Sequence, residues 1–302
     1  MDKILEFGVR LLFWCIRILP VRLAGAIGAG IGRISFSILS RHRNNTVKNL
    51  KRIYPKREHS WHIKTARESF AELGRTMFEL PHVYLRSEAF LLSRIEPRIE
   101  DEFRAAMQQG NGAFITACHH SNWELGALSF SLLGYASSLI YRPINQPGLD
   151  RYLKQCRERF GARLHSRQEG LRWMPKSLKQ GDAIGIMIDQ HMSQGIRAPF
   201  LGQMANTTEL PAPFIIKNKT PLFGVALMRI GHAFRFQLRV WPIPHPEMTG
   251  DKEKDTLRIM SRINESFEST IHERPELWLW VHRRWLILDE QEMVSEAADG
   301  TS

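Results

Sequence analysis

The stretch FITACHHSNWELG, residues 114–126, carries the residue types and spacing best suited to catalysis in this 302-residue chain. His119 follows an apolar run, and Glu124 comes five residues later. Five residues along one continuous helix set two side chains about 140° apart, so the pair can meet only if His119 lies in a turn before the helix. Glu124 would then accept a hydrogen bond from one imidazole nitrogen, while the other nitrogen takes the proton of a substrate hydroxyl. Free N–H groups at the start of the helix would stabilise a developing oxyanion.

Other interpretations of the same stretch stay open. Ser121 and Glu124 have the spacing of a capping box, in which Glu124 is only a helix cap, and a single loop histidine is often structural. A zinc site would draw on His119, His120, Glu124, Asp189 and His191, but their spacings match no standard zinc motif. We therefore predict no metal site. A serine hydrolase is disfavoured because the G-x-S-x-G motif is absent.

Alternating strand and helix patterns supply the elements that would position His119. Residues 58–92 are predicted to form two or three helices. Strands are expected at residues 112–119, 137–141, 163–165, 183–189, 221–230 and 234–243. Helices are expected near residues 100–109, from 122, and at 149–160, 169–180, 209–218 and 252–273, with a long loop before 209. This order predicts an α/β fold with a largely parallel central sheet flanked by helices.

The net charge of +11 is concentrated at the N-terminus. Residues 1–57 carry twelve Lys or Arg against two acids, which leaves the rest of the chain close to neutral. A nucleic-acid binder would spread its positive charge over a recognition surface, so we expect no nucleic-acid partner. The three cysteines form no disulfide or zinc pattern, which favours a reducing compartment.

Two apolar segments, residues 4–19 and 23–40, precede a basic run at 41–57. The charges of the first segment fall on one stripe of a helical wheel, as in a helix that lies in a membrane interface with its charges toward water. A tilted membrane span and two buried helices of a soluble protein are the alternatives. We expect a membrane-associated helical segment at 1–57, an α/β domain at 58–288 and a frayed acidic tail at 289–302.

The sequence resembles the bacterial lipid A late acyltransferases, the lauroyl and myristoyl transferases, and related inner-membrane glycolipid acyltransferases with an H-x4-[DE] motif. The likeness covers nearly the whole chain. Its matching blocks are HHSNWE at 119–124, Tyr141-Arg142-Pro143, Asp189-Gln190, 198–202, 205–208 and PELWLWVHRRW at 275–285. Ser121 stands where the family usually has glycine, and Leu210 and Leu277 also depart from its pattern.

The resemblance implies that His119 is a general base and Glu124 its partner. It assigns Asp189 and an arginine to substrate binding, and Arg167 is our choice for that arginine, with Arg163 and Arg172 as alternatives. Arg142 and Asn122 are the remaining expected substrate-binding residues.

The implied reaction moves a fatty acyl chain from acyl carrier protein or acyl-CoA to a hydroxyl of a lipid A precursor or similar anionic glycolipid. It needs no cofactor and takes place at the cytoplasmic face of a bacterial inner membrane. Acylation of a lysophospholipid or a mannosylated lipid, and a non-catalytic lipid-binding role, are the alternatives.

Overall fold

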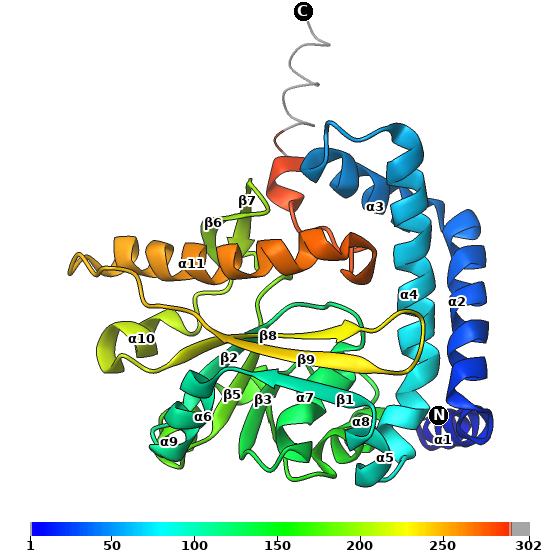
Figure 1. Ribbon diagram of the computed structural model, residues 1–302, viewed down its shortest axis with the longest axis horizontal. Coiled ribbons are helices and arrows are strands. Elements are labelled where there is room, and N and C mark those ends of the chain that lie inside the picture. Colours follow the sequence, from blue (N-terminus) through cyan, green and yellow to red (C-terminus); the bar gives the residue numbers. More distant parts are fainter. Residues whose placement is uncertain (1, 290, 292–302) are drawn as a thin grey trace, which may run out of the picture.

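Seven strands form the central sheet of the protein, for which a computed structural model describes residues 2–289 and 291. The sheet order is β1-β9-β8-β2-β5-β3-β4, and every neighbouring pair is parallel except β8 and β9 (Figure 1). The strands are β1 (Ile95–Ile99), β2 (Ala113–Ala117), β3 (Ser137–Tyr141), β4 (Arg163–Ser166), β5 (Ala183–Met187), β8 (Leu222–Arg229) and β9 (Phe236–Pro242). The predicted α/β fold with a largely parallel sheet is confirmed.

Helices cover both faces of this sheet. They are α4 (His59–Leu85), α5 (Glu88–Leu92), α6 (Asp101–Gln108), α7 (Trp123–Leu132), α8 (Pro147–Glu158), α9 (Trp173–Lys179), α10 (Ala212–Asn218) and α11 (Lys252–Glu273). In β2, Phe114 belongs to the core with α11, whereas Ala113 and Ile115 pack in the core that holds α7 and α8. The central strand is thus apolar on both sides, as parallel sheets require.

Two regions differ from the sequence-based expectation. The predicted long loop before residue 209 contains an antiparallel pair, β6 (Ile196–Phe200) and β7 (Gln203–Thr207). Leu201 and Gly202 join them with positive φ angles of 52° and 73°, and a leucine in such a turn hides the usual signal. The helix expected at 169–180 begins only at Trp173, because a short 3-10 turn (Arg167–Glu169) and Gly170, with φ 74°, precede it.

The N-terminal helices α1 (Asp2–Ile18) and α2 (Val21–Ile38) meet at a corner formed by Pro20 (Figure 1). Among the described residues, α2 is the one helix long and apolar enough to cross a membrane, with a mean hydropathy of 1.2. It lies directly against α4. A Cβ on Gly28 would collide with the backbone oxygen of Gly74, and one on Gly32 with that of Phe70, so the two backbones touch.

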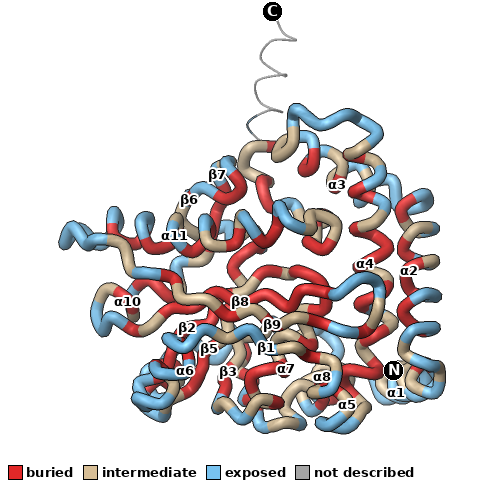
Figure 2. Tube along the Cα trace, viewed as in Figure 1, coloured by how far each residue is buried: buried red, intermediate tan, exposed pale blue. Residues whose placement is uncertain are grey.

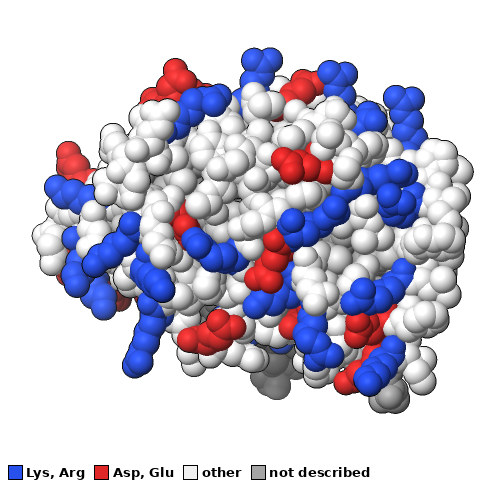
Figure 3. Space-filling view, turned by 90° about the horizontal axis from the view of Figure 1, so that it is seen from below, with Lys and Arg blue, Asp and Glu red and all other residues white. Residues whose placement is uncertain are grey.

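Part of the charged stripe of α1 contacts the protein, while Lys3 and Arg10 remain exposed to solvent as expected. Arg17 donates to the carbonyl oxygen of Leu85, Arg10 lies over the Tyr152 ring, and Glu6 pairs with Arg10. Both helices carry exposed stretches, pale blue in Figure 2. Their exposed large apolar residues are Ile4, Leu5, Phe7, Leu11, Leu12, Trp14, Ile18, Leu23, Ile27, Ile31, Ile34 and Ile38. The margin of the molecule formed by these helices is largely uncharged in Figure 3.

The basic run after α2 folds as α3 (Ser40–Ile53) and contacts the α/β domain. Asn49 donates to the carbonyl oxygens of Trp280 and His282, at 2.9 and 2.8 Å. Asp289, the first residue of the expected tail, is buried and pairs with Arg52. Of the rest of that tail, only residue 291 is described.

Candidate active site

His119 and Asp189 lie side by side because their strands are neighbours. In the parallel pair β2–β5, Ala117 is opposite Met187, so the residues two positions beyond each strand meet at the carboxyl edge of the sheet. His119 Nδ1 is 2.8 Å from Asp189 Oδ1, and the His119 backbone N–H donates to Asp189 Oδ2 at 2.7 Å. Trp278 Nε1 donates to the same Oδ2 at 2.8 Å.

Asp189 is ionised in this arrangement. Burial alone would raise the pKa of its carboxyl group, but the charge of His119 and the hydrogen bonds from His119 and Trp278 outweigh burial and lower the pKa to about 2. A carboxylate at Nδ1 keeps the proton of a neutral imidazole on that nitrogen. Nε2 then carries the lone pair that a general base needs.

The Gln190 side chain lies between Nε2 of His119 and Nε2 of His282. The Gln190 side-chain nitrogen is 3.2 Å from His119 Nε2 and 2.9 Å from His282 Nε2. Burial and the charge of His119 both lower the pKa of His282, so His282 is held neutral beside the candidate base. The side chain of His119 retains 14% of its exposure, which leaves Nε2 within reach of a substrate.

Glu124 does not take the position at His119 that its spacing suggested. Its carboxylate is held by Arg157 of α8, through Nε at 2.8 Å and Nη2 at 2.6 Å, and by the Tyr84 hydroxyl at 2.6 Å. Burial raises the pKa of Glu124, but Arg157, Tyr84 and the nearby charge of His119 together lower it below its usual range. Glu124 is therefore an ionised neighbour of His119, whereas the hydrogen-bonded carboxylate is Asp189.

The turn between β2 and α7 also differs from the predicted capping box. The N-cap is Asn122, whose Oδ1 accepts from the Leu125 N–H at 3.1 Å, while Ser121 adopts φ 54°. This left-handed conformation favours glycine. It gives a physical reason for glycine to be usual there in the resembling family. Asn122 is fully buried, so the structure gives it a capping contact and no exposed surface for a substrate.

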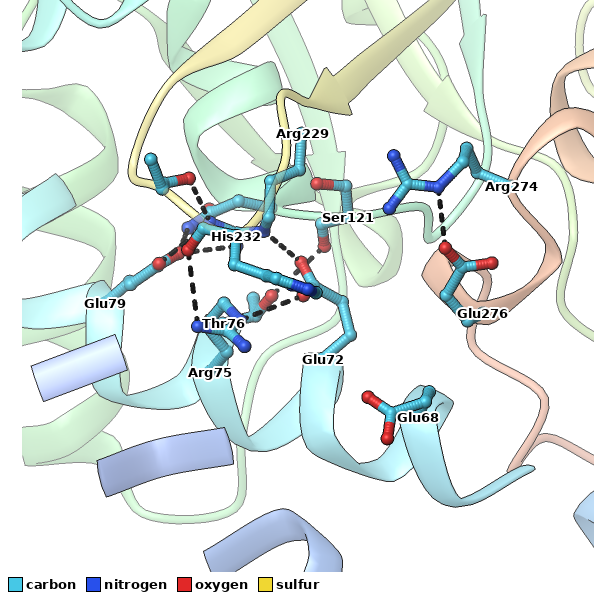
Figure 4. A network of polar contacts seen from close by, with 12 residues as sticks. Glu68, Glu72, Arg75, Thr76, Glu79, Ser121, Arg229, His232, Arg274 and Glu276 are labelled. Carbon is cyan, nitrogen blue, oxygen red and sulfur yellow. Dashed lines mark hydrogen bonds and ion pairs between the residues drawn. The ribbon is translucent and has the colours of Figure 1, made fainter. Parts of the chain in front are cut away.

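A buried ionic network ties this turn to α4 (Figure 4). Asn122 Nδ2 donates to Glu79 Oε2 at 3.0 Å, and Thr76 donates to the Ser121 carbonyl oxygen. Arg229, at the end of β8, donates to Glu79 through Nη1 and Nη2 at 2.9 and 2.7 Å and to Glu72 through Nε at 2.5 Å. The turn that carries His119 is therefore held in place by a network of buried ion pairs and hydrogen bonds with α4 and β8.

Two of the arginines expected to bind substrate follow strands at the carboxyl edge of the sheet, where His119 and Asp189 also lie. Arg142 follows β3, and Arg167 follows β4; both are exposed. Arg172 is also exposed, just before α9. Arg163 pairs with the buried Asp182, which gives it a structural role. Arg157, beside Glu124, is the arginine that sequence reasoning missed.

The segment at 275–285 contacts the residues of the site through Trp278, Leu279 and Arg284. Arg284 is fully buried and donates to the carbonyl oxygens of Gln190 and Asn206 and to the Thr207 hydroxyl. It therefore holds β7 and the segment after β5 together, and is no surface ion-pair residue. His282 and Arg284 were not predicted as site residues. Both lie in the PELWLWVHRRW block that resembles the family, and this block was the sequence feature that could have pointed to them.

Within residues 2–289 and 291, no group of three His, Cys, Asp or Glu side chains is arranged to hold a metal ion. Cys118, next to His119, is buried. Burial and the charge of Asp189 raise the pKa of its thiol well above the ordinary value, so it stays protonated.

The chain is similar in sequence to known proteins along nearly its whole length. Residues 3–287 match the family described as bacterial lipid A biosynthesis acyltransferase. In Escherichia coli (strain K12), the chain is 23% identical over 283 residues to a lipid A biosynthesis palmitoleoyltransferase, covering 92% of this chain and 90% of that protein. It is 24% identical over 274 residues to a lipid A biosynthesis myristoyltransferase (88% and 82% covered) and 22% identical over 286 residues to a lauroyltransferase (90% and 88% covered). These relatives are named for different acyl chains, so the likeness selects none of them.

Proposed function

The chain belongs to the bacterial lipid A biosynthesis acyltransferase family, and on that premise we propose that it moves a fatty acyl chain from an acyl thioester to a hydroxyl of a lipid A precursor or similar anionic glycolipid. The observation that carries the mechanism is the His119–Asp189 pair, with Nδ1 held at 2.8 Å from an ionised carboxylate. Acyl carrier protein and coenzyme A are the two candidate carriers of the thioester.

In the proposed reaction, the acceptor hydroxyl replaces the Gln190 amide at Nε2 of His119. His119 takes the hydroxyl proton as the oxygen attacks the thioester carbonyl carbon. A C–O bond forms, the C–S bond breaks, and the proton passes from His119 to the departing thiolate. Asp189 stabilises the imidazolium that exists between these steps. The thioester already carries the activation, so no covalent enzyme intermediate is required.

The charged residues around this pair have supporting roles in the proposal. Glu124 adds a second negative charge near His119 and orients Arg157, whose guanidinium is matched to carboxylate and phosphate oxygens. The N–H groups of Trp123 and Glu124, at the start of α7, are our candidates for stabilising the oxyanion. Arg142 and Arg167 would bind the anionic groups of donor or acceptor along the sheet edge.

We further propose that the enzyme is attached to the cytoplasmic face of the inner membrane by α1 and α2 lying in the membrane plane. If α2 crossed a bilayer while packed on α4, the exposed Lys64 and Arg67 of α4 would lie at the same depth as hydrocarbon. Charged side chains at that depth are costly. In the in-plane orientation, only the outward apolar side chains of α1 and α2 enter the membrane.

The test is transfer of a labelled acyl chain by the purified full-length protein. With acyl carrier protein or coenzyme A thioesters and a lipid A precursor as acceptor, His119→Ala should lower kcat by about 10²- to 10⁴-fold, the usual contribution of positioned proton transfer. A folded His119→Ala protein with near-normal transfer would overturn the mechanism. Lysophospholipid and mannosylated-lipid acceptors run in parallel decide between the acceptor classes.

A further inference from the structure

A cavity of about 480 Å³ opens at the corner between α1 and α2. Pro20 and Arg22 line it from the corner, Arg94 and Glu96 from the start of β1, and Phe234 and Arg235 from the turn before β9. None of its lining residues belongs to the candidate active site. Its size is in the range of small-molecule sites.

The lining of this corner cavity is strongly basic. It carries three guanidinium groups, from Arg22, Arg94 and Arg235, against the single carboxylate of Glu96. Arg235 pairs with Glu96 at 2.5 Å, so two positive charges remain uncompensated by the lining. Such a surplus favours an anion.

Arg94 is the most restricted of the three arginines. Its guanidinium lies 4.8 Å from the centroid of the Phe90 ring, and its Nε is buried without a hydrogen-bond partner among the described residues. Arg94 also lines the cavity, so its guanidinium charge is available to an anion bound there. Arg22 and Arg235 are exposed and can close over the same ligand.

The surroundings of the corner cavity indicate what carries the anion. Ile18, at the end of α1, and Leu23, in the first turn of α2, are exposed apolar side chains that flank its Pro20–Arg22 wall. In the in-plane orientation these side chains enter the membrane, and the cavity then lies at the level of the lipid headgroups. A basic pocket at that level suits a lipid phosphate.

We propose that the corner cavity is a binding site, separate from the catalytic centre, for the phosphate headgroup of an anionic membrane lipid. The lipid phosphate binds Arg94 and Arg22, and the acyl chains lie against the apolar surface of α1 and α2. A lipid bound in the corner cavity would fix the orientation of the enzyme relative to the membrane surface. This inference rests on the proposed in-plane attachment but not on acyl transfer.

The experiment counts lipids bound to the purified full-length protein by native mass spectrometry in a non-ionic detergent. Phosphatidylglycerol and phosphatidylcholine with identical acyl chains are titrated separately. One phosphatidylglycerol should bind with at least tenfold higher affinity than phosphatidylcholine. Arg94→Gln should weaken phosphatidylglycerol binding about tenfold, the loss expected for one charge-assisted contact, and Glu96→Gln should strengthen it. Equal affinity for the two lipids would overturn the proposal.

Controls separate a built site from general attraction to positive charge. Arg41→Gln removes an exposed charge from α3, outside the lining, and should change the affinity less than twofold. Equal losses in Arg41→Gln and Arg94→Gln would refute the site. Arg22→Gln, at an exposed position, provides the same test if Arg94→Gln does not fold.

Displacement of the lipid by equimolar inorganic phosphate would refute a lipid as the ligand. No acyl donor is present, so a negative result leaves the proposed transferase reaction untouched.

Discussion

The two carboxylates near His119 have different partners, and this difference can be tested at the level of single residues. Asp189→Asn should lower kcat about a hundredfold or more, because the imidazolium formed during catalysis loses its stabilising charge. The charge of His119 helps to lower the pKa of Asp189, and this mutual attraction is lost in Asp189→Asn, so the acid limb of the kcat/KM profile should move to lower pH. The measurement is a pH–rate profile of acyl transfer for the wild type and the variant.

Glu124→Gln is the matched control for Asp189→Asn, since it also replaces a buried carboxylate by an amide. It breaks the bidentate pair with Arg157 but leaves the His119–Asp189 hydrogen bond intact. The acid limb should therefore move less in Glu124→Gln than in Asp189→Asn. A larger shift in Glu124→Gln would restore Glu124 as the partner suggested by its spacing.

The sequence predicted His119, Glu124 and Asp189 as site residues, with Glu124 as the hydrogen-bond partner of the histidine, whereas the structure places Asp189 in that position. Spacing along the chain constrains only local geometry, and Asp189 reaches His119 through the register of β2 and β5, which are not consecutive strands. Arg157 was missed for the same reason. Its contact with Glu124 joins α8 to α7, and nothing in the sequence around residue 157 marks it.

The turn between β2 and α7 gives a prediction at the scale of one element. Ser121 has φ 54°, and its hydroxyl is buried without a hydrogen-bond partner among the described residues. Ser121→Gly should raise the free energy of unfolding by about 0.5–1 kcal/mol, because glycine adopts this conformation without steric cost. Urea unfolding in detergent measures the change. An equal gain in Ser121→Ala would assign the effect to the hydroxyl and contradict the backbone explanation.

The buried network between α4 and β8 gives a second prediction at this scale. Arg229→Met leaves Glu72 and Glu79 buried without their main cation, and should lower the free energy of unfolding by about 3–5 kcal/mol. Arg239→Met on β9 is the control, because it breaks a partly exposed pair with Glu273 that contributes at most about 1 kcal/mol. The free energies of unfolding of both variants are measured by urea unfolding. Similar losses would show that burial of the network does not matter.

Elements with strong periodicity were predictable, and those fixed by unusual backbone angles were not. The predicted bounds of the helix at 252–273 agree with α11, whose apolar positions recur at helical spacing. The β6–β7 hairpin was missed because Leu201 occupies a left-handed position that turn rules reserve for glycine or asparagine. Periodicity also defined two faces of α1 without saying which one meets the protein, and the structure places Arg17 of the charged face against the end of α4.

At the scale of the whole molecule, the N-terminal helices both cover the α/β domain and expose the apolar surface proposed to meet the membrane. The α2–α4 contact buries Ala24, Ala29 and Phe36. Helix α3 holds the backbone of His282, next to the candidate base, through Asn49. The basic segment 1–57 is therefore packed against the rest of the protein. This packing raises the question whether residues 58–288 can fold without it.

Two truncations separate the covering role from the membrane role. A chain starting at Glu58 should aggregate or unfold without cooperativity, since it exposes the apolar face of α4 and leaves the Trp280 and His282 carbonyl oxygens without Asn49. A chain starting at Leu19 loses only α1 and should fold, because the α2–α4 glycine contact and α3 remain. It should leave membranes at a lower detergent concentration than the full-length protein, because only the exposed apolar side chains of α2 remain. Neither chain should leave at about 1 M salt, where the Debye length is about 3 Å, since apolar burial is not screened. Sedimentation and thermal unfolding of the three chains provide the measurement, and cooperative unfolding of the Glu58 chain would establish a separable anchor instead.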